Sequence, residues 1–363
     1  MITKLDKKRY FQLLTEKLHE VAARPVKLME VCGTHTMAIG KAGIRGVLPQ
    51  QVELISGPGC PVCVTADADI DAFMQLAEDN RVTIATYGDM MRVPGTKGSL
   101  AELKARGADI RLVYSALEAL SFARAEPSRE IVFLGVGFET TAPATAHAVK
   151  VAKQEGLANF SIYNLHKTVP EALRVLVQDK ATSIDGFILP GHVSVIIGEA
   201  PYQFLAEEFG AVGAIAGFEP PEIMVAVLKL VKDINAGKPV ITNLYRKVVR
   251  SEGNIVAQRL LDEVFKKSSA EWRGLGVIPG SGLALREEFE QFDAARKFAV
   301  ERRSVKFHSG CRCGEILKGV IKPKQCALFG RRCTPDNPVG PCMVSSEGTC
   351  AAYYLYHGGE EVV

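Results

Sequence analysis

The chain has 363 residues, of which 47% are hydrophobic and 23% are charged, and its formal net charge is +3. This composition excludes a disordered chain, and so small a charge indicates neither nucleic acid nor an acidic membrane as a partner. A chain of this length predicts two or three domains. It contains no run of about 18 apolar residues and begins with a charged amphipathic segment. We therefore expect a cytoplasmic protein that does not bind a membrane.

Nine cysteines, an odd number, lie in groups separated by wide gaps. In a reducing compartment such groups indicate metal or redox chemistry rather than structural disulfides.

The first group is a single cysteine at the end of a predicted strand. Apolar residues at three- and four-residue steps predict a helix over residues 11–21, and the strand Val26–Val31 follows Pro25. Cys32 comes next, directly before a second helical pattern, at the position where open α/β sheets bind ligands. We expect the N–H groups of that helix to lower the pKa of Cys32 and make it a better nucleophile or metal ligand.

The second group is the CxxC pair Cys60 and Cys63, in the turn Gly57–Cys63 after the predicted strand Val52–Ile55. Proline and glycine hold this turn stiff, so the two thiols can bridge each other or share a metal. We expect the turn at the same sheet edge as Cys32.

Strands alternate with loops and helices from here to residue 250, which predicts parallel sheets. Further strands are expected at 82–87 and 110–114, and after a linker at 126–128 the pattern restarts with a strand at 131–136. We therefore predict two similar α/β domains. Residues 1–126 hold the N-terminal helix with Cys32, Cys60 and Cys63, and residues 127–250 form the second domain.

Neither domain carries a glycine-rich phosphate-binding loop, so no nucleotide is indicated. The loops of the second domain carry four residues that could act as acids or bases or could shape a cleft: Glu139, His166, His192 and Glu219. Because these loops follow parallel strands, we expect the four side chains to line one cleft.

Residues 251–363 predict a third domain that is helical and loop-rich. A helix over 255–265 and a turn-rich bridge over 277–282 precede six cysteines: Cys311, Cys313, Cys326, Cys333, Cys342 and Cys350. A segment so poor in apolar runs requires a metal to hold it together. Zinc usually binds two close pairs, whereas this wide and uneven spacing favours an iron–sulfur cluster.

Six motifs together resemble the HypD family of hydrogenase maturation factors, over nearly the whole chain. They are Cys32–Thr36, Gly57–Cys63, Gly88–Gly95, Gly137–Thr141, Pro190–Ser194 and Ser346–Tyr354.

The resemblance implies an assembly scaffold for [NiFe]-hydrogenases. In that family HypD, with its small partner HypC, holds the iron that becomes Fe(CN)2CO, and HypE supplies cyanide made with HypF. Cys32 would then bind the iron together with a cysteine of HypC, with His35 beside it. Thiolate suits electron-rich ferrous iron. Cys60 and Cys63 would be a redox-active pair near that iron.

The resemblance also implies a [4Fe-4S] cluster, for which Cys326, Cys333 and Cys350 match the ligands. Cys311 and Cys313 compete for the fourth place, Cys313 being favoured, and Cys342 is left without a role. We hypothesise that the cluster supplies electrons to a Cys60–Cys63 disulfide. The alternatives are an iron–sulfur thiol–disulfide oxidoreductase without an iron cargo, and a binding module with structural zinc.

Overall fold

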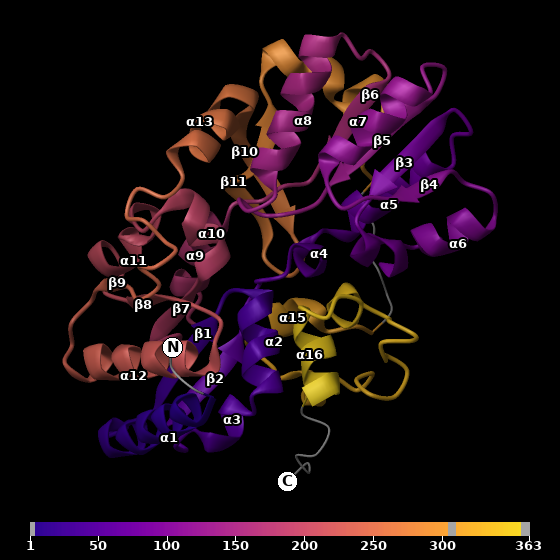
Figure 1. Ribbon diagram of the computed structural model, residues 1–363. Coiled ribbons are helices and arrows are strands. Elements are labelled where there is room, and N and C mark those ends of the chain that lie inside the picture. Colours follow the sequence, from indigo (N-terminus) through magenta and orange to yellow (C-terminus); the bar gives the residue numbers. More distant parts are fainter. Residues whose placement is uncertain (1–3, 304–309, 357–363) are drawn as a thin grey trace.

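The computed structural model describes residues 4–303 and 310–356. It contains two parallel sheets, which confirms the predicted fold class (Figure 1). The first sheet has the order β2-β1-β7-β8-β9, and its strands are β1 (Val26–Glu30), β2 (Val52–Ser56), β7 (Gly186–Pro190), β8 (Val212–Ala216) and β9 (Ile241–Asn243).

The second sheet has the order β4-β3-β5-β6 and is likewise parallel throughout. Its strands are β3 (Val82–Thr86), β4 (Ile110–Leu112), β5 (Glu130–Gly135) and β6 (Phe160–Asn164). All residues of β3 and of β7 are buried, as expected for parallel strands whose sheet is covered on both faces.

The division between the sheets does not coincide with the boundary that we predicted at residue 126. The chain leaves the first sheet after β2, builds the whole second sheet, and returns with β7. Residue 126 lies between β4 and β5, inside the second sheet. The physical reason is that β1 is a central strand, which pairs with β2 on one side and with the distant β7 on the other.

Helices cover both sheets. The longer ones are α1 (Lys4–Val21), α5 (Asp67–Ala77), α7 (Ala116–Ala125), α8 (Ala142–Glu155), α9 (Val169–Gln178), α12 (Pro220–Asn235) and α13 (Ile255–Val264). The shorter ones are α2 (Gly33–Lys41), α3 (Ile44–Val47), α4 (Pro61–Val64), α6 (Leu100–Ala105), α10 (Gly191–Ile197), α11 (Phe204–Glu207), α14 (Ala294–Lys297), α15 (Cys313–Leu317) and α16 (Thr349–Tyr356). In the part of the chain that the structure describes, no helix has the length and apolar composition needed to cross a bilayer.

The described residues also form five short 3₁₀ helices: η1 (Gly88–Arg92), η2 (Ala200–Tyr202), η3 (Glu287–Phe292), η4 (Pro323–Gln325) and η5 (Pro341–Met343). The cysteine-rich C-terminal segment lies against the first sheet's loops, where α16 contacts α2 and η5 contacts α4 (Figure 1). The tertiary structure therefore brings the last cysteines to the CxxC turn.

The prediction of a turn-rich bridge over 277–282 was wrong. These residues belong to β11 (Gly276–Leu285), which pairs antiparallel with β10 (Phe265–Trp272). The register shifts between Ser268 and Ala270, opposite Pro279–Ser281, so the proline and the positive φ of Gly280 mark a local irregularity rather than the end of a strand. The predicted third domain thus contains a hairpin, whose ends pack on the core of the second sheet.

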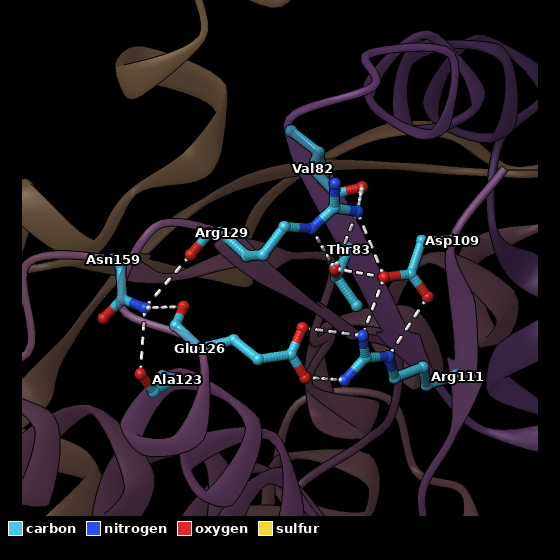
Figure 2. Close-up of polar contacts among 8 residues, drawn as sticks. All are labelled: Val82, Thr83, Asp109, Arg111, Ala123, Glu126, Arg129 and Asn159. Carbon is cyan, nitrogen blue, oxygen red and sulfur yellow. Dashed lines mark hydrogen bonds and ion pairs between the residues drawn. The ribbon is translucent and has the colours of Figure 1, made fainter.

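A polar network joins the amino-terminal ends of the second sheet's strands (Figure 2). The guanidinium of Arg111 binds Asp109 and Glu126, while Asp109 also accepts hydrogen bonds from Thr83 at 2.6 Å and from Arg129 at 3.1 Å. These contacts lie at the edge opposite the loops that follow the strands. They stabilise the amino-terminal ends of the strands, whereas the loops at the carboxyl ends are not part of this network.

Candidate functional site

The CxxC turn lies at the same sheet edge as Cys32, as predicted, and the two segments are in direct contact. Cys32 follows β1 and is the N-cap of α2, and the N–H of Gly33 donates to the carbonyl oxygen of Gly59 at 2.9 Å. A Cβ atom on Gly59 would lie 2.7 Å from the carbonyl carbon of Cys32. Glycine is therefore required for the turn to approach the Cys32 backbone this closely.

A cavity of about 570 Å³ opens beside Cys32, at the carboxyl ends of strands from both sheets. Its walls come from the loops after β1, β2, β3, β4, β5 and β7 and from the C-terminal segment. The lining residues that matter below are Cys32, Gly59, Leu112, Tyr114, Thr140, His192 and Glu347. Two sheets whose strand ends face a common space form the kind of crevice in which α/β proteins bind ligands.

The expected low pKa of Cys32 was wrong. Burial raises the pKa of this thiol to about 11, because the loss of solvent outweighs the hydrogen bonds from the N–H groups of His35 and Thr34. Cys32 is only 8% exposed. The free thiol therefore holds its proton at neutral pH, and a metal that binds Cys32 must displace that proton.

The CxxC pair lies behind the cavity wall. Cys60 is the N-cap of α4 and its sulfur accepts the N–H of Cys63 at 3.4 Å, which holds the two side chains on one turn. Both are buried, and the cavity wall at this point is formed by Pro61 and Val62. The pair faces the cysteine-rich segment, where Cys63 Sγ donates to the carbonyl oxygen of Pro341 at 3.9 Å.

Cys342, to which the sequence assigned no role, lies between the CxxC pair and the other C-terminal cysteines. Its side chain interacts with those of Cys63, Cys313 and Cys350. A continuous series of thiols therefore runs from Cys60 through Cys63 and Cys342. It ends among the cysteines near the C-terminus.

Five thiols line one narrow cavity: Cys311, Cys313, Cys326, Cys333 and Cys350. The remaining wall is mostly apolar, and a Cβ atom on Gly340 would lie 2.7 Å from Cys313 Sγ and still closer to Cys311 Sγ. The N–H of Val339 donates to Cys333 Sγ at 3.3 Å.

These observations fit an iron–sulfur cluster, whose ligands are thiolates in an apolar pocket that accept N–H hydrogen bonds. Across residues 4–303 and 310–356, no three His, Cys, Asp or Glu side chains converge as the ligands of a single metal ion would. The fit therefore rests on the donor set. Cys311 and Cys313 both remain available for the fourth place, with their sulfur atoms 3.0 Å apart.

Comparison with known proteins agrees with the motifs. The family model described as "HypD: Hydrogenase formation hypA family" matches residues 9–357. The chain is 47% identical to the hydrogenase maturation factor HypD of Rhodobacter capsulatus, over 95% of this chain and 93% of that protein. It is 47% identical to the HypD of Cupriavidus necator, over 92% and 91%, and 45% identical to that of Escherichia coli K12, over 94% and 92%.

This chain belongs to the HypD family. The resemblance drawn from the six motifs is thereby confirmed.

Glu347 is a site residue of this HypD-family chain that our sequence analysis did not select. It lines the Cys32 cavity, and its carboxylate accepts a hydrogen bond from Thr34 Oγ1 at 2.6 Å. A Cβ atom on Gly33 would lie 2.6 Å from Glu347 Cβ. Glu347 could have been selected from the sequence because it belongs to the motif Ser346–Tyr354, three residues before Cys350.

The two histidines predicted near the site, His35 and His192, lie in different positions relative to the cavity. His35 is buried outside the cavity lining, with Nε2 2.9 Å from the carbonyl oxygen of Gly217, and burial lowers its pKa to about 4. His192 lines the cavity and stacks on Phe218 at 4.0 Å between ring centroids; the other histidine, His35, stacks on the same ring at 4.6 Å. His35 therefore supports the wall, and His192 forms part of it.

The single cleft predicted for the four loop residues was wrong, because His192 alone among them lines the Cys32 cavity. Glu139 accepts the N–H of Val169 at the start of α9 at 2.9 Å, which turns its carboxyl toward another cavity of about 470 Å³. His166 lines a third cavity of about 340 Å³. Glu219 is on the surface, where it pairs with Lys7 at 3.1 Å.

Proposed function

We propose that this chain acts in the maturation of [NiFe]-hydrogenases, as the scaffold on which the Fe(CN)2CO group is assembled with a HypC partner. The iron is a cargo, bound by the thiolate of Cys32. The observation that carries the proposal is the position of Cys32, which joins the large cavity between the two sheets to the turn that bears the CxxC pair. The names of the related proteins support a role in hydrogenase maturation. The position of Cys32 at the cavity supports iron binding by a thiolate.

The Cys32 site suits an iron cargo in three respects. Its thiolate is a soft ligand that matches ferrous iron with cyanide and carbonyl ligands. Its cavity has room for those ligands and for a second thiolate from a partner. Glu347, held by Thr34 at the cavity wall, can accept the proton that Cys32 loses when iron binds.

The rim of the cavity suits a protein partner. Tyr114 is 95% exposed and Leu112 is 55% exposed. Both line the cavity, Leu112 as the last residue of β4 and Tyr114 in the loop that follows. Exposed aromatic and aliphatic side chains are typical of protein contact sites. We assign this rim to HypC, which would supply the second iron ligand, and in turn to HypE, which donates the cyanide produced with HypF.

The thiol series suits control of the redox state at the site. A disulfide between Cys60 and Cys63 has no thiolate to offer, and its reduction takes two electrons and two protons. A thiolate at Cys342 lies where it can attack Cys63 and release Cys60 as a thiol. A [4Fe-4S] cluster held by the C-terminal cysteines would supply electrons to this series.

The test is infrared spectroscopy of the protein purified anaerobically with HypC. The wild-type complex should show the cyanide and carbonyl stretches of the cargo, and Cys32→Ser should lose them. Thr140→Ser, which keeps a hydroxyl on the same cavity wall, is the control and should retain them. Retention of both stretches in Cys32→Ser would overturn the assignment of Cys32.

A thiol–disulfide oxidoreductase with no iron cargo is the second candidate, and the buried thiol series is the observation that favours it. The two functions differ at Cys32, because exchange between Cys342, Cys63 and Cys60 does not require it. If Cys32→Ser reduces a protein disulfide as fast as wild type, and neither protein ever carries cyanide-ligated iron, the oxidoreductase is correct.

A further inference from the structure

Lys167 is a buried lysine that makes no direct ion pair with a described residue, although the carboxylates of Asp69 and Glu271 lie near enough to act on its charge. It follows β6, its N–H donates to the carbonyl oxygen of Gly137 at 3.0 Å, and its backbone bridges to Gly282 of β11. The residue is 2% exposed. Among the residues described here its ammonium group makes no ion pair and no hydrogen bond, although lysine is almost never fully buried unless paired.

The side chain lines the 340 Å³ cavity that lies between β6 and the β10–β11 hairpin. This cavity shares no lining residue with the Cys32 cavity, so it is a separate site. Tyr163 lines it too, and within the described ranges its hydroxyl has no hydrogen-bond partner. Two hydrogen-bond donors that have no partner among the described residues therefore lie at one cavity.

The charged neighbours of Lys167 are engaged with one another. Arg302 binds Asp69 through Nε at 2.5 Å and binds Glu271 through Nη2 at 2.5 Å. Asp293 also lines the cavity. Asp69 and Glu271 thus share the guanidinium of Arg302, while Asp293 pairs with Arg296 at 4.0 Å. Three carboxylates at one cavity leave it unfavourable for a free anion even beside an ammonium group.

The environment of Lys167 favours the neutral, reactive form of the amine. Burial lowers the pKa of Lys167 to about 8, and the charge of Arg302 lowers it further, against the opposing charges of Asp69 and Glu271. About a tenth of the amine is then neutral at pH 7, far more than for an exposed lysine. Burial raises the pKa of Tyr163, so the phenol keeps its proton and remains a donor.

We propose that this cavity binds a small neutral carbonyl compound, an aldehyde or a ketone, and that Lys167 Nζ condenses with it to form a Schiff base. The carbonyl carbon–oxygen double bond breaks and a carbon–nitrogen double bond forms. The oxygen leaves as water with the two protons of the amine, and nothing is oxidised or reduced. Tyr163 is the positioning residue, donating to the carbonyl oxygen as it departs.

The test is reductive trapping on the full-length protein. Propionaldehyde and sodium cyanoborohydride are added at pH 7, and mass spectrometry of peptides follows alkylation at each lysine over time. Lys167 should react about ten-fold faster than the exposed Lys267, which serves as an internal reference because it lies on the neighbouring hairpin. Equal or slower reaction at Lys167 would overturn the proposal.

Two further measurements keep the result specific. Tyr163→Phe should slow trapping at Lys167 several-fold and leave Lys267 unchanged; an equal loss at both positions would mean damaged folding and would contradict the positioning role. Millimolar inorganic phosphate should not protect Lys167. Strong protection would show that the cavity holds an anion, which would overturn the assignment to a neutral carbonyl compound.

Discussion

The thiol of Cys63 lies beside that of Cys342, and Cys63 Sγ donates to the carbonyl oxygen of Pro341 at 3.9 Å. This contact joins the turn after β2 to a segment near the other end of the chain. It converts two separate groups of cysteines into one buried series. We therefore expect reduction of the CxxC pair to depend on Cys342, a residue outside both the CxxC motif and the cavity of five thiols.

Cys342→Ser is the variant that tests this dependence. The visible absorption of the proposed cluster should persist. Recovery of the Cys60 and Cys63 thiols after oxidation should slow about ten-fold under a limiting reductant, because serine cannot exchange with a disulfide. Alkylation of the two thiols, followed by mass spectrometry, measures the rate. Recovery at the wild-type rate would show that Cys342 has no part in it.

Cys311 and Cys313 should differ as cluster ligands. Our sequence analysis favoured Cys313, but Cys313 interacts with Cys342 and so has a second use in the thiol series. We therefore expect Cys311→Ala to lose the cluster, and Cys313→Ala to retain it while slowing thiol recovery. Iron content and visible absorption, measured anaerobically, distinguish the two, and the opposite pattern would restore Cys313 as the ligand.

The rim of the Cys32 cavity should contribute to partner binding. Tyr114→Glu places a charge on a 95% exposed aromatic position and should weaken binding of HypC by about ten-fold or more. Isothermal titration with purified HypC measures the change. Val256→Glu is the matched control, since Val256 is 77% exposed on α13 and does not line the cavity. An equal effect of both substitutions would argue against a contact at Tyr114.

The ion pair between Arg45 and Glu30 should be essential for stability. Glu30 is fully buried at the end of β1, and Arg45 pairs with it and lies over the ring of Tyr353 in α16 at 4.9 Å. Arg45→Met leaves the carboxyl buried without its partner, so the free energy of unfolding should fall by about 3–5 kcal/mol. Urea denaturation measures it. The double variant Arg45→Met with Glu30→Gln should recover part of the loss, and no recovery would place the effect elsewhere.

Glu139 should make stability depend on pH. Burial raises its pKa from 4.5 to about 8, so the folded state keeps a proton that the unfolded state loses above about 4.5. The free energy of unfolding should therefore fall as the pH rises from about 4.5 to about 8. Glu139→Gln keeps the bond to the Val169 N–H and should be about 1–3 kcal/mol more stable than wild type at pH 9. Thermal melts of both proteins at pH 5 and pH 9 test this, and parallel curves would contradict it.

The sequence by itself determined what depends on short stretches of chain. Alternating strands and helices predicted parallel sheets, and the strand before Cys32 placed that thiol at a strand end, as the structure shows. The turn Gly57–Cys63 carried its own proline and glycine constraints. These features depend on backbone preferences and apolar periodicity within about ten residues, which are readable without the fold.

Tertiary structure alone decided which distant segments meet. The partition of strands between the sheets follows from β1 pairing with β7, and no local pattern specifies a partner so far away in the chain. The positions of Cys342 and Glu347 beside the CxxC turn and Cys32, the separation of Glu139 and Glu219 from the cavity, and the raised pKa of Cys32 all depend on packing and on the exclusion of water. Burial is a property of the assembled core, which explains why a helix N-terminus correctly located from sequence still gave the wrong sign for the pKa shift.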